Sequence, residues 1–213
     1  ALRRMPALRV LALRTLGLSD AATSELFSAS VPQLRVLVLI EMNVKPAAAR
    51  ALAATGWPLK ELNLSHNPGL GAAGVAALIA APTFAIRRLC LAFCRLDAAS
   101  VLAVANAAWP LEELDLSGND FRDAADGPAL AALSRHAGLR FLLVNMCLFG
   151  PANFRALVEA AWPALASFDA GTAVVTPGNP LVLGAAAFAS FPVLEELALP
   201  AVLLDEAGAP MSK

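Results

Sequence analysis

Residues 111–116 read Leu-Glu-Glu-Leu-Asp-Leu, with leucines at the first, fourth and sixth positions. Side chains alternate along an extended strand, so Leu114 and Leu116 point to one face while Glu113 and Asp115 point to the other. The segment therefore predicts a short strand with one apolar face to bury and one polar face open to solvent.

The same spacing of apolar residues recurs along the whole chain. Segments of this kind begin at residues 8, 34, 59, 86, 111, 139, 165 and 194, at intervals of 25 to 29 residues. One short strand cannot bury its apolar face alone, whereas stacked repeats pair their strands and build a continuous core. We therefore predict one domain over residues 1–213, made of about eight repeats.

The residues that follow each strand resemble a known repeat family. Asn67 and Asn119 stand three residues after the last leucine of their strands, and Cys94 and Cys147 stand there in two other repeats. This pattern resembles the leucine-rich repeat, Leu-x-x-Leu-x-Leu-x-x-Asn/Cys-x-Leu. The resemblance implies an α/β solenoid, or horseshoe, with a parallel concave sheet of about eight short strands and helices on the convex side.

Four repeats depart from the pattern at the Asn/Cys position, where they carry Leu16, Met42, Ala173 and Val202. An asparagine amide both donates and accepts hydrogen bonds, so it satisfies backbone groups where the chain leaves the strand. These four side chains cannot do so. We expect their turns to be held less firmly.

The segments between the strands predict helices. An N-cap residue is expected at Asp20, Asp97 and Asp126. A proline suited to a first helical turn stands at Pro46, Pro128 and Pro151. Returns of this length resemble the ribonuclease-inhibitor-like (intracellular) repeat type. A large residue precedes a proline at the end of most returns, and we expect Trp57, Trp109 and Trp162 to pack in the core rather than form an aromatic site.

The two ends of the sequence lack the polar caps that terminal repeats of a solenoid need. Residues 1–7 read as the tail of a preceding helix, and residues 203–213 are too short to complete a final one. We therefore expect the chain to be a fragment of a longer protein, or a chain whose ends dock on another molecule.

Composition narrows the possible partners. Hydrophobic residues make up 58% of the chain, charged residues 15%, and the formal net charge is −1. Glycines and prolines interrupt every uncharged stretch that approaches the roughly 20 residues of a membrane span. No run of basic residues favours nucleic acid. Three cysteines without a signal peptide favour a reducing, cytoplasmic (intracellular) location. We predict a protein partner of unknown identity, no nucleic acid and no membrane insertion.

The concave strand face is the expected binding surface. Its outward side chains combine charged and apolar groups, as protein interfaces do. The candidate partner-binding residues are Glu61, Asn63, Arg88, Glu113, Asp115, Phe141, Leu143, Asn145 and Asp169. We predict a non-catalytic protein–protein interaction scaffold.

Catalytic residues, a metal and a cofactor are not predicted. His66 and His136 fall in different repeats, and the three cysteines lack zinc-binding spacing. Two alternatives stay open. One is a regulator of an enzyme, similar to a GTPase activator, for which Arg14 is the candidate arginine. The other is a structural subunit of a large assembly, which the high hydrophobic content favours.

Overall fold

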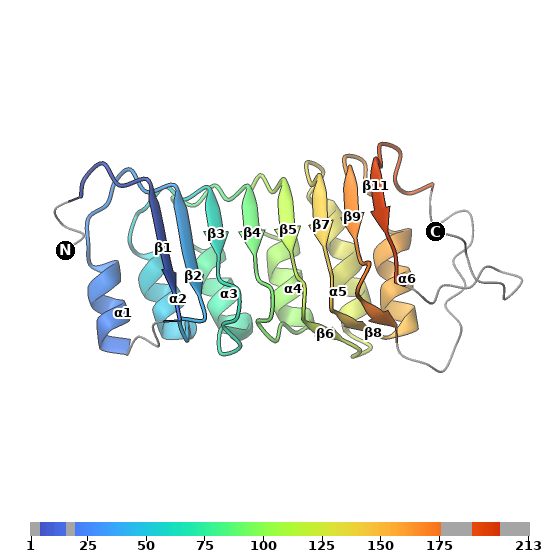
Figure 1. The fold of residues 1–213 in the computed structure, drawn as a ribbon, viewed down its shortest axis with the longest axis horizontal. Coiled ribbons are helices and arrows are strands. Elements are labelled where there is room, and N and C mark those ends of the chain that lie inside the picture. Colours follow the sequence, from blue (N-terminus) through green and yellow to red (C-terminus); the bar gives the residue numbers. More distant parts are fainter. Residues whose placement is uncertain (1–4, 16–19, 176–188, 201–213) are drawn as a thin grey trace, which may run out of the picture.

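The protein is described by a computed structural model that covers residues 5–15, 20–175 and 189–200. Eight parallel strands form one sheet in the order β1-β2-β3-β4-β5-β7-β9-β11. The helices stack in a second layer behind this sheet, and β1 and β11 lie at opposite ends of the molecule (Figure 1). The predicted α/β solenoid with a parallel sheet of eight strands is confirmed.

Each strand of the sheet is short and is followed by a return to the next. The strands are β1 (Val10–Arg14), β2 (Val36–Ile40), β3 (Glu61–Asn63), β4 (Arg88–Cys90), β5 (Glu113–Asp115), β7 (Phe141–Leu143), β9 (Ser167–Asp169) and β11 (Glu196–Ala198). The helices are α1 (Asp20–Phe27), α2 (Pro46–Ala53), α3 (Gly71–Ile79), α4 (Ala98–Ala105), α5 (Asp126–Ala132), the 3₁₀ turn η2 (Leu133–Arg135) and α6 (Pro151–Glu159). A second, three-stranded sheet is formed by β6 (Asp120–Phe121), β8 (Leu148–Phe149) and β10 (Val174–Val175).

The core lies between the sheet and the helices and is built by the repeated leucines. The middle residues of successive strands pair in register, as Leu62 does with Leu89 and Leu89 with Leu114. Leu62, Leu64, Leu114 and Leu116 are each at most 1% exposed. Full burial of one leucine side chain contributes about 1.5–3 kcal/mol, so stacking stabilises every repeat through its neighbours.

The two asparagines tie adjacent repeats together rather than holding only their own turns. The Asn67 Oδ1 atom accepts hydrogen bonds from the backbone N–H groups of Met42 and Val44, at 3.1 and 2.9 Å. Its Nδ2 atom donates to the carbonyl groups of Leu39 and Leu64, at 2.8 and 2.7 Å. The side chain is fully buried. One amide thus satisfies backbone groups of two consecutive repeats.

This geometry corrects the expectation for Met42. The turn at Met42 is held by Asn67 of the following repeat, although its own repeat lacks an asparagine. An asparagine therefore supports the turn of the repeat before it as well as its own. Asn119 likewise accepts from the N–H groups of Cys94 and Leu96, at 3.2 and 3.0 Å. The expectation stays a prediction for Ala173, whereas residues 16 and 202 lie outside the described part of the chain.

The helix starts match the sequence prediction in most places. Asp97 is the N-cap of α4, and its side chain accepts a hydrogen bond from the Ser100 N–H at 2.8 Å. Pro46 and Pro151 are the first residues of α2 and α6. The prediction for Asp126 is wrong, because this residue begins α5 and its carboxylate accepts from the Asp123 N–H. Asp20 is likewise the first residue of α1.

The three tryptophans pack in the core, as predicted. Trp57, Trp109 and Trp162 are 1%, 7% and 2% exposed. The indole N–H of Trp57 donates to the Ala29 carbonyl at 3.2 Å, and that of Trp162 donates to the Leu157 carbonyl at 2.9 Å. Buried indoles with satisfied N–H groups serve packing, which leaves recognition to other surfaces.

Candidate functional site

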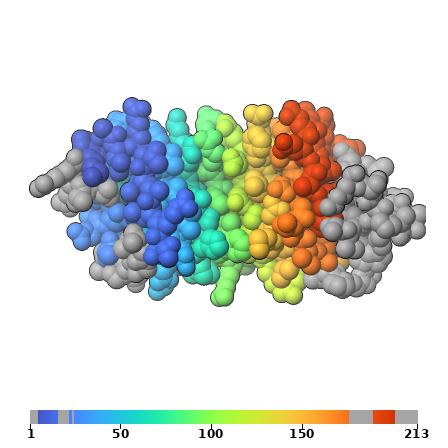
Figure 2. Space-filling model, in the orientation of Figure 1, coloured from blue at the N-terminus to red at the C-terminus, as the bar shows by residue number. Residues whose placement is uncertain are grey.

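The strand face is the side of the eight-stranded sheet that the helices do not cover. Figure 1 views the molecule from this side, and Figure 2 shows the same face as a continuous surface from β1 to β11. Along β2 the side chains alternate between half-buried and buried, so Val36, Val38 and Ile40 face outward. The alternation predicted from the sequence therefore places every second side chain where a partner can contact it.

The nine candidate residues form one contiguous band on the strand face. In one row Glu61, Arg88, Glu113 and Phe141 pair strand by strand. In a second row Asn63, Cys90, Asp115, Leu143 and Asp169 do the same. Asn145 joins this band through a hydrogen bond from its Nδ2 atom to the Asp169 carboxylate at 2.6 Å. Arg14 ends β1 and is exposed outside the band.

A shallow depression of about 190 Å³ occupies the band's first half. Val36 and Val38 supply apolar walls, and Glu61, Arg88 and Glu113 supply charges. The Arg88 guanidinium forms a salt bridge with the Glu61 carboxylate, and the hydrogen bond and charge of Glu61 raise the pKa of Arg88 above its ordinary value. Apolar surface beside charges is the composition expected of a polar protein interface.

Three polar residues in the second row hold the chain where it leaves the sheet. Each accepts a hydrogen bond from the backbone N–H two residues later: Asn63 from Ser65 at 2.9 Å, Asp115 from Ser117 at 2.9 Å and Asp169 from Gly171 at 3.1 Å. This is the local side-chain to backbone bond that asparagine and aspartate favour at turns. Part of the polarity of the strand face therefore has a structural cause.

Cys90 lies within the same row and acts as a hydrogen-bond donor. Its thiol donates to the Asp115 carboxylate at 3.1 Å and lies 2.9 Å from the Ser65 hydroxyl. Burial, aided by the negative charge of Asp115, raises the pKa of Cys90 to about 12. Burial raises the pKa of Cys94 to about 11 and that of Cys147 to about 12. All three thiols stay protonated near neutral pH, which suits donation rather than nucleophilic attack.

An apolar group occupies the other half of the band. Phe141 is 38% exposed and Met146 is 59% exposed, with half-buried Leu143 between them. The Arg140 guanidinium carbon lies 5.5 Å from the centre of the Phe141 ring. Exposed aromatic and methionine side chains beside an arginine are enriched in protein interfaces.

The two histidines do not meet. His66 is exposed at the carboxyl edge of the sheet, where its ring stacks on Phe93 with centroids 4.5 Å apart. His136 is buried, and its Nε2 atom lies 2.8 Å from the Val104 carbonyl. The Phe93 ring also covers Gly118, where a Cβ atom would lie 2.3 Å from a ring carbon. Gly118 has a positive φ of 68°, so the turn and the stack both require glycine there.

Sequence reasoning missed a row of basic side chains at the amino edge of the sheet. The second residue of four successive strand segments is basic: Arg9, Arg35, Lys60 and Arg87. These residues are about one repeat apart in sequence, so no basic run exists, yet their backbones are hydrogen-bonded neighbours. Reading each position of the repeat as a column, instead of scanning along the chain, reveals the row.

Comparison with known proteins identifies the repeat. A Leucine Rich repeat family model matches residues 58–78 and 110–125. No curated protein matches the chain. Among solved structures, an internalin from Listeria monocytogenes is 13% identical with a TM-score of 0.49, and the similarity covers 93% of this chain and 57% of that one. In the described part of the chain, no helix is long and apolar enough to cross a membrane. The family model thus identifies leucine-rich repeats at residues 58–78 and 110–125, within a chain whose described residues fold as an α/β solenoid.

Proposed function

We propose that this protein is a non-catalytic interaction scaffold that binds a partner protein through the strand face. The observation that carries the proposal is the one-sided covering of the sheet. The described helices lie on one side of the sheet (Figure 1). The alternate side chains of the strands therefore face outward on the other side, as the burial pattern of β2 shows. Such a surface is the usual recognition surface of a solenoid.

The contacts within the band indicate which residues carry recognition. Asn63, Asp115 and Asp169 have backbone partners in their own turns, so their substitution would also disturb folding. Val38 and Phe141 are outward-facing apolar side chains, and no side-chain hydrogen bond is formed by Glu113 within the described residues. We expect binding energy to concentrate in the depression and at Phe141, because a few central, desolvated side chains dominate most interfaces.

The proposal also covers the extent and setting of the scaffold. Eight of the described strands form one continuous sheet that includes every repeat, which supports one interaction domain rather than two. Helical returns behind each strand of the central repeats support the ribonuclease-inhibitor-like type, and with it an intracellular setting. A place in a larger complex fits the same surface, since a solenoid can contact several chains along its length.

Site-specific photo-crosslinking in cells that express the protein tests the strand face directly. A photoreactive residue is placed at Val38 or Phe141, with a matched control at the exposed Ala76 of α3 on the helical side. We expect discrete crosslinked protein bands from Val38 and Phe141 and none of the same mass from Ala76. Crosslinks of equal yield from Ala76, or from Ala76 alone, would contradict the proposal.

A further inference from the structure

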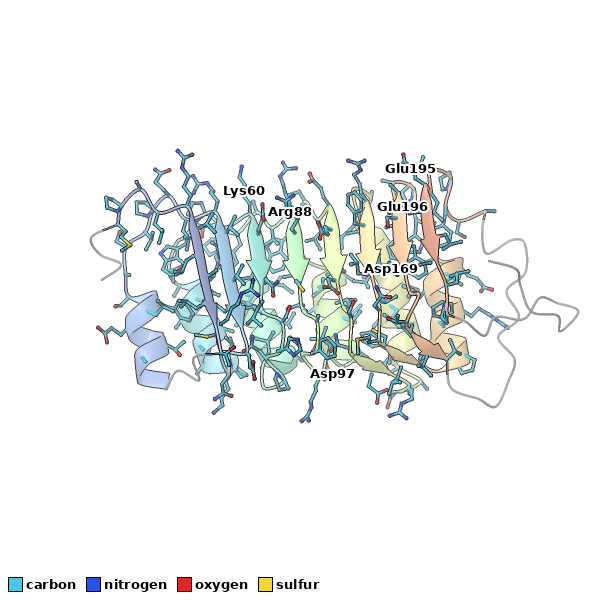
Figure 3. The ribbon with its side chains drawn as sticks, viewed as in Figure 1. Lys60, Arg88, Asp97, Asp169, Glu195 and Glu196 are labelled. Carbon is cyan, nitrogen blue, oxygen red and sulfur yellow. The ribbon has the colours of Figure 1, made fainter. Side chains whose placement is uncertain are left out.

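The amino edge of the sheet carries a row of side chains that the backbone itself aligns. The N–H of Arg35 donates to the Arg9 carbonyl, that of Lys60 to Arg35 and that of Arg87 to Lys60, each at 2.8 Å. The same ladder continues through Glu112, Arg140, Ala166 and Glu195. Figure 3 shows Lys60 and Glu195 at this edge and Asp97 at the opposite one.

Four positively charged residues of successive repeats therefore stand side by side, each immediately before one of the strands β1 to β4. We call Arg9, Arg35, Lys60 and Arg87 the basic row. Neighbouring strands lie about 4.8 Å apart, so the four cations fall within one Debye length of their neighbours at physiological salt. Arg9, Lys60 and Arg87 are exposed and Arg35 is half-buried. Adjacent like charges disfavour folding slightly, so their alignment gives the fold no benefit.

Most of this charge is not neutralised within the described structure. Arg87 forms a salt bridge with Glu112, and both side chains are largely exposed. Arg35 makes only long contacts, of 3.4 and 3.5 Å, with the carbonyls of Leu34 and Pro32. No ion pair is formed by Arg9 or Lys60 among residues 5–15, 20–175 and 189–200. Three of the four cations are thus available to an outside anion.

We propose that the basic row is a docking site for an extended acidic peptide segment of a protein partner. The segment would cross β1 to β4 at their amino ends and place its carboxylates against successive Arg and Lys side chains. Long basic side chains adjust to the spacing of carboxylates, and arginine binds them through two parallel hydrogen bonds. This site adjoins the strand-face band but uses different residues, so it does not depend on the function proposed above.

The surroundings of the row favour a peptide over nucleic acid. The row has acidic neighbours at the starts of β3 and β5, namely Glu61, Glu112 and Glu113. A wide nucleic-acid duplex would bring its phosphates close to these carboxylates, which would repel them. Single-stranded nucleic acid is bound where aromatic side chains accompany basic ones. The outward residues beside the row are Val10, Val36, Glu61 and Arg88, which offer no ring for a base to stack on.

The edge also changes sign along its length, which limits the site. At the position before the strand that is basic in the first four repeats, the last repeat carries Glu195, followed by Glu196 as the first residue of β11 (Figure 3). An acidic segment is therefore attracted to the first four repeats and repelled from the last. This asymmetry gives the docked segment a defined place on the solenoid.

Fluorescence anisotropy with a labelled peptide of about ten glutamates tests the proposal on the purified chain. The variant Arg35→Glu/Lys60→Glu is compared with Arg50→Glu, which changes an exposed cation of α2 away from the row. We expect salt-sensitive binding by the wild type, about tenfold weaker binding by the double variant and less than about twofold change for Arg50→Glu. Equal loss in both variants, or no binding by the wild type, would overturn the proposal.

Two further arms separate the class of partner and protect against misfolding. Single-stranded and duplex oligonucleotides with the same number of charges should bind more weakly than the peptide, and tighter binding of either would assign the row to nucleic acid instead. Arg35→Gln/Lys60→Gln should give an intermediate loss, while thermal unfolding of every variant stays close to that of the wild type. Full binding by the glutamine variant would contradict the role of these charges.

Discussion

The two edges of the same sheet use their side chains in opposite ways. At the carboxyl edge, Asn67, Asn119 and Asp115 each satisfy backbone groups, and the chain enters left-handed conformations at residues such as His66 and Phe93. At the amino edge, the backbone ladder is complete without any side chain. The side chains of the carboxyl edge stabilise the fold, whereas those of the amino edge can differ in charge without loss of backbone hydrogen bonds.

This difference separates the consequences of substitution along the solenoid. A change at the carboxyl edge leaves buried N–H and C=O groups without partners, which costs stability. A change at an exposed position of the amino edge, such as Lys60, alters only a solvated charge, so it affects binding far more than folding. Residues that have no structural task are therefore the better candidates for recognition, and substitutions at the two edges can measure the contrast.

The largest effect is expected for Asn67→Ala. Removing the amide leaves the N–H groups of Met42 and Val44 and the carbonyl of Leu39 without their side-chain partner in a fully buried site. We expect the free energy of unfolding to fall by about 3–5 kcal/mol, since each buried unsatisfied group costs about 1–3 kcal/mol. Urea unfolding measures the change, with Gln33→Ala at an exposed loop position as the control. A loss below about 1 kcal/mol would show that the turns do not depend on the amide.

Cys94→Ala should cost less, although Cys94 occupies the same position of the next repeat. Its thiol donates to the Leu64 carbonyl at 3.1 Å, and the Asn119 amide, which this variant retains, holds the Cys94 N–H. We expect a loss of about 1–2 kcal/mol, from one weak hydrogen bond and a small buried volume. The same unfolding experiment compares the two variants. An equal loss for Cys94→Ala and Asn67→Ala would remove the distinction between amide and thiol turns.

The repeated segments predicted the fold in detail because a solenoid is a local problem. The spacing of Leu111, Leu114 and Leu116 determines one strand, and stacking repeats that strand with little freedom of arrangement. The parallel order of the strands, the outward-facing rows of side chains and the burial of the tryptophans were all predicted from this repeat pattern. Asp126 was misassigned because an aspartate at a helix start can either cap from outside or stand in the first turn, and both satisfy the helix.

The candidate site was predicted less completely, because the sequence of a single repeat does not indicate which residues of neighbouring repeats it contacts. The hydrogen bond between Asn67 and the Met42 N–H joins two repeats. Considering each turn alone therefore led to the wrong prediction that the turn at Met42 is held less firmly. The basic row was not predicted for the same reason, because its four residues are each about one repeat apart in the sequence. The polar residues of the band were found, but their bonds to the following backbone N–H could not be distinguished from a recognition role.

Asp97→Ala tests a capping bond of the carboxyl edge that also depends on pH. The carboxylate accepts from the Ser100 N–H and hydroxyl, and these bonds hold the pKa of Asp97 below its ordinary value. A lowered folded pKa means that this stabilisation is complete above the ordinary value of about 3.9 and is lost as the pH falls through the folded pKa. We expect a loss of about 1 kcal/mol at neutral pH.

Urea unfolding of wild type and Asp97→Ala at a series of pH values checks this sign. The difference between the two curves should shrink as the pH falls below about 4. Asp97→Asn keeps an acceptor oxygen, so it should retain most of the stability at neutral pH and lack the acid dependence. A difference that grows on acidification would contradict the lowered pKa.

The smallest effect is expected for Lys60→Ala and Arg35→Ala at the amino edge. Lys60 is exposed, and Arg35 makes only long contacts with backbone carbonyls, so neither removal leaves a buried group without a partner. We expect the free energy of unfolding to change by less than about 0.5 kcal/mol in either direction, with a small gain where repulsion within the basic row is relieved. Thermal unfolding at low and high salt measures both terms, because screening should abolish the gain and leave the rest unchanged. A loss comparable to that of Cys94→Ala would mean that the amino edge also holds the fold, and the contrast between the two edges would no longer separate structural side chains from those free to bind.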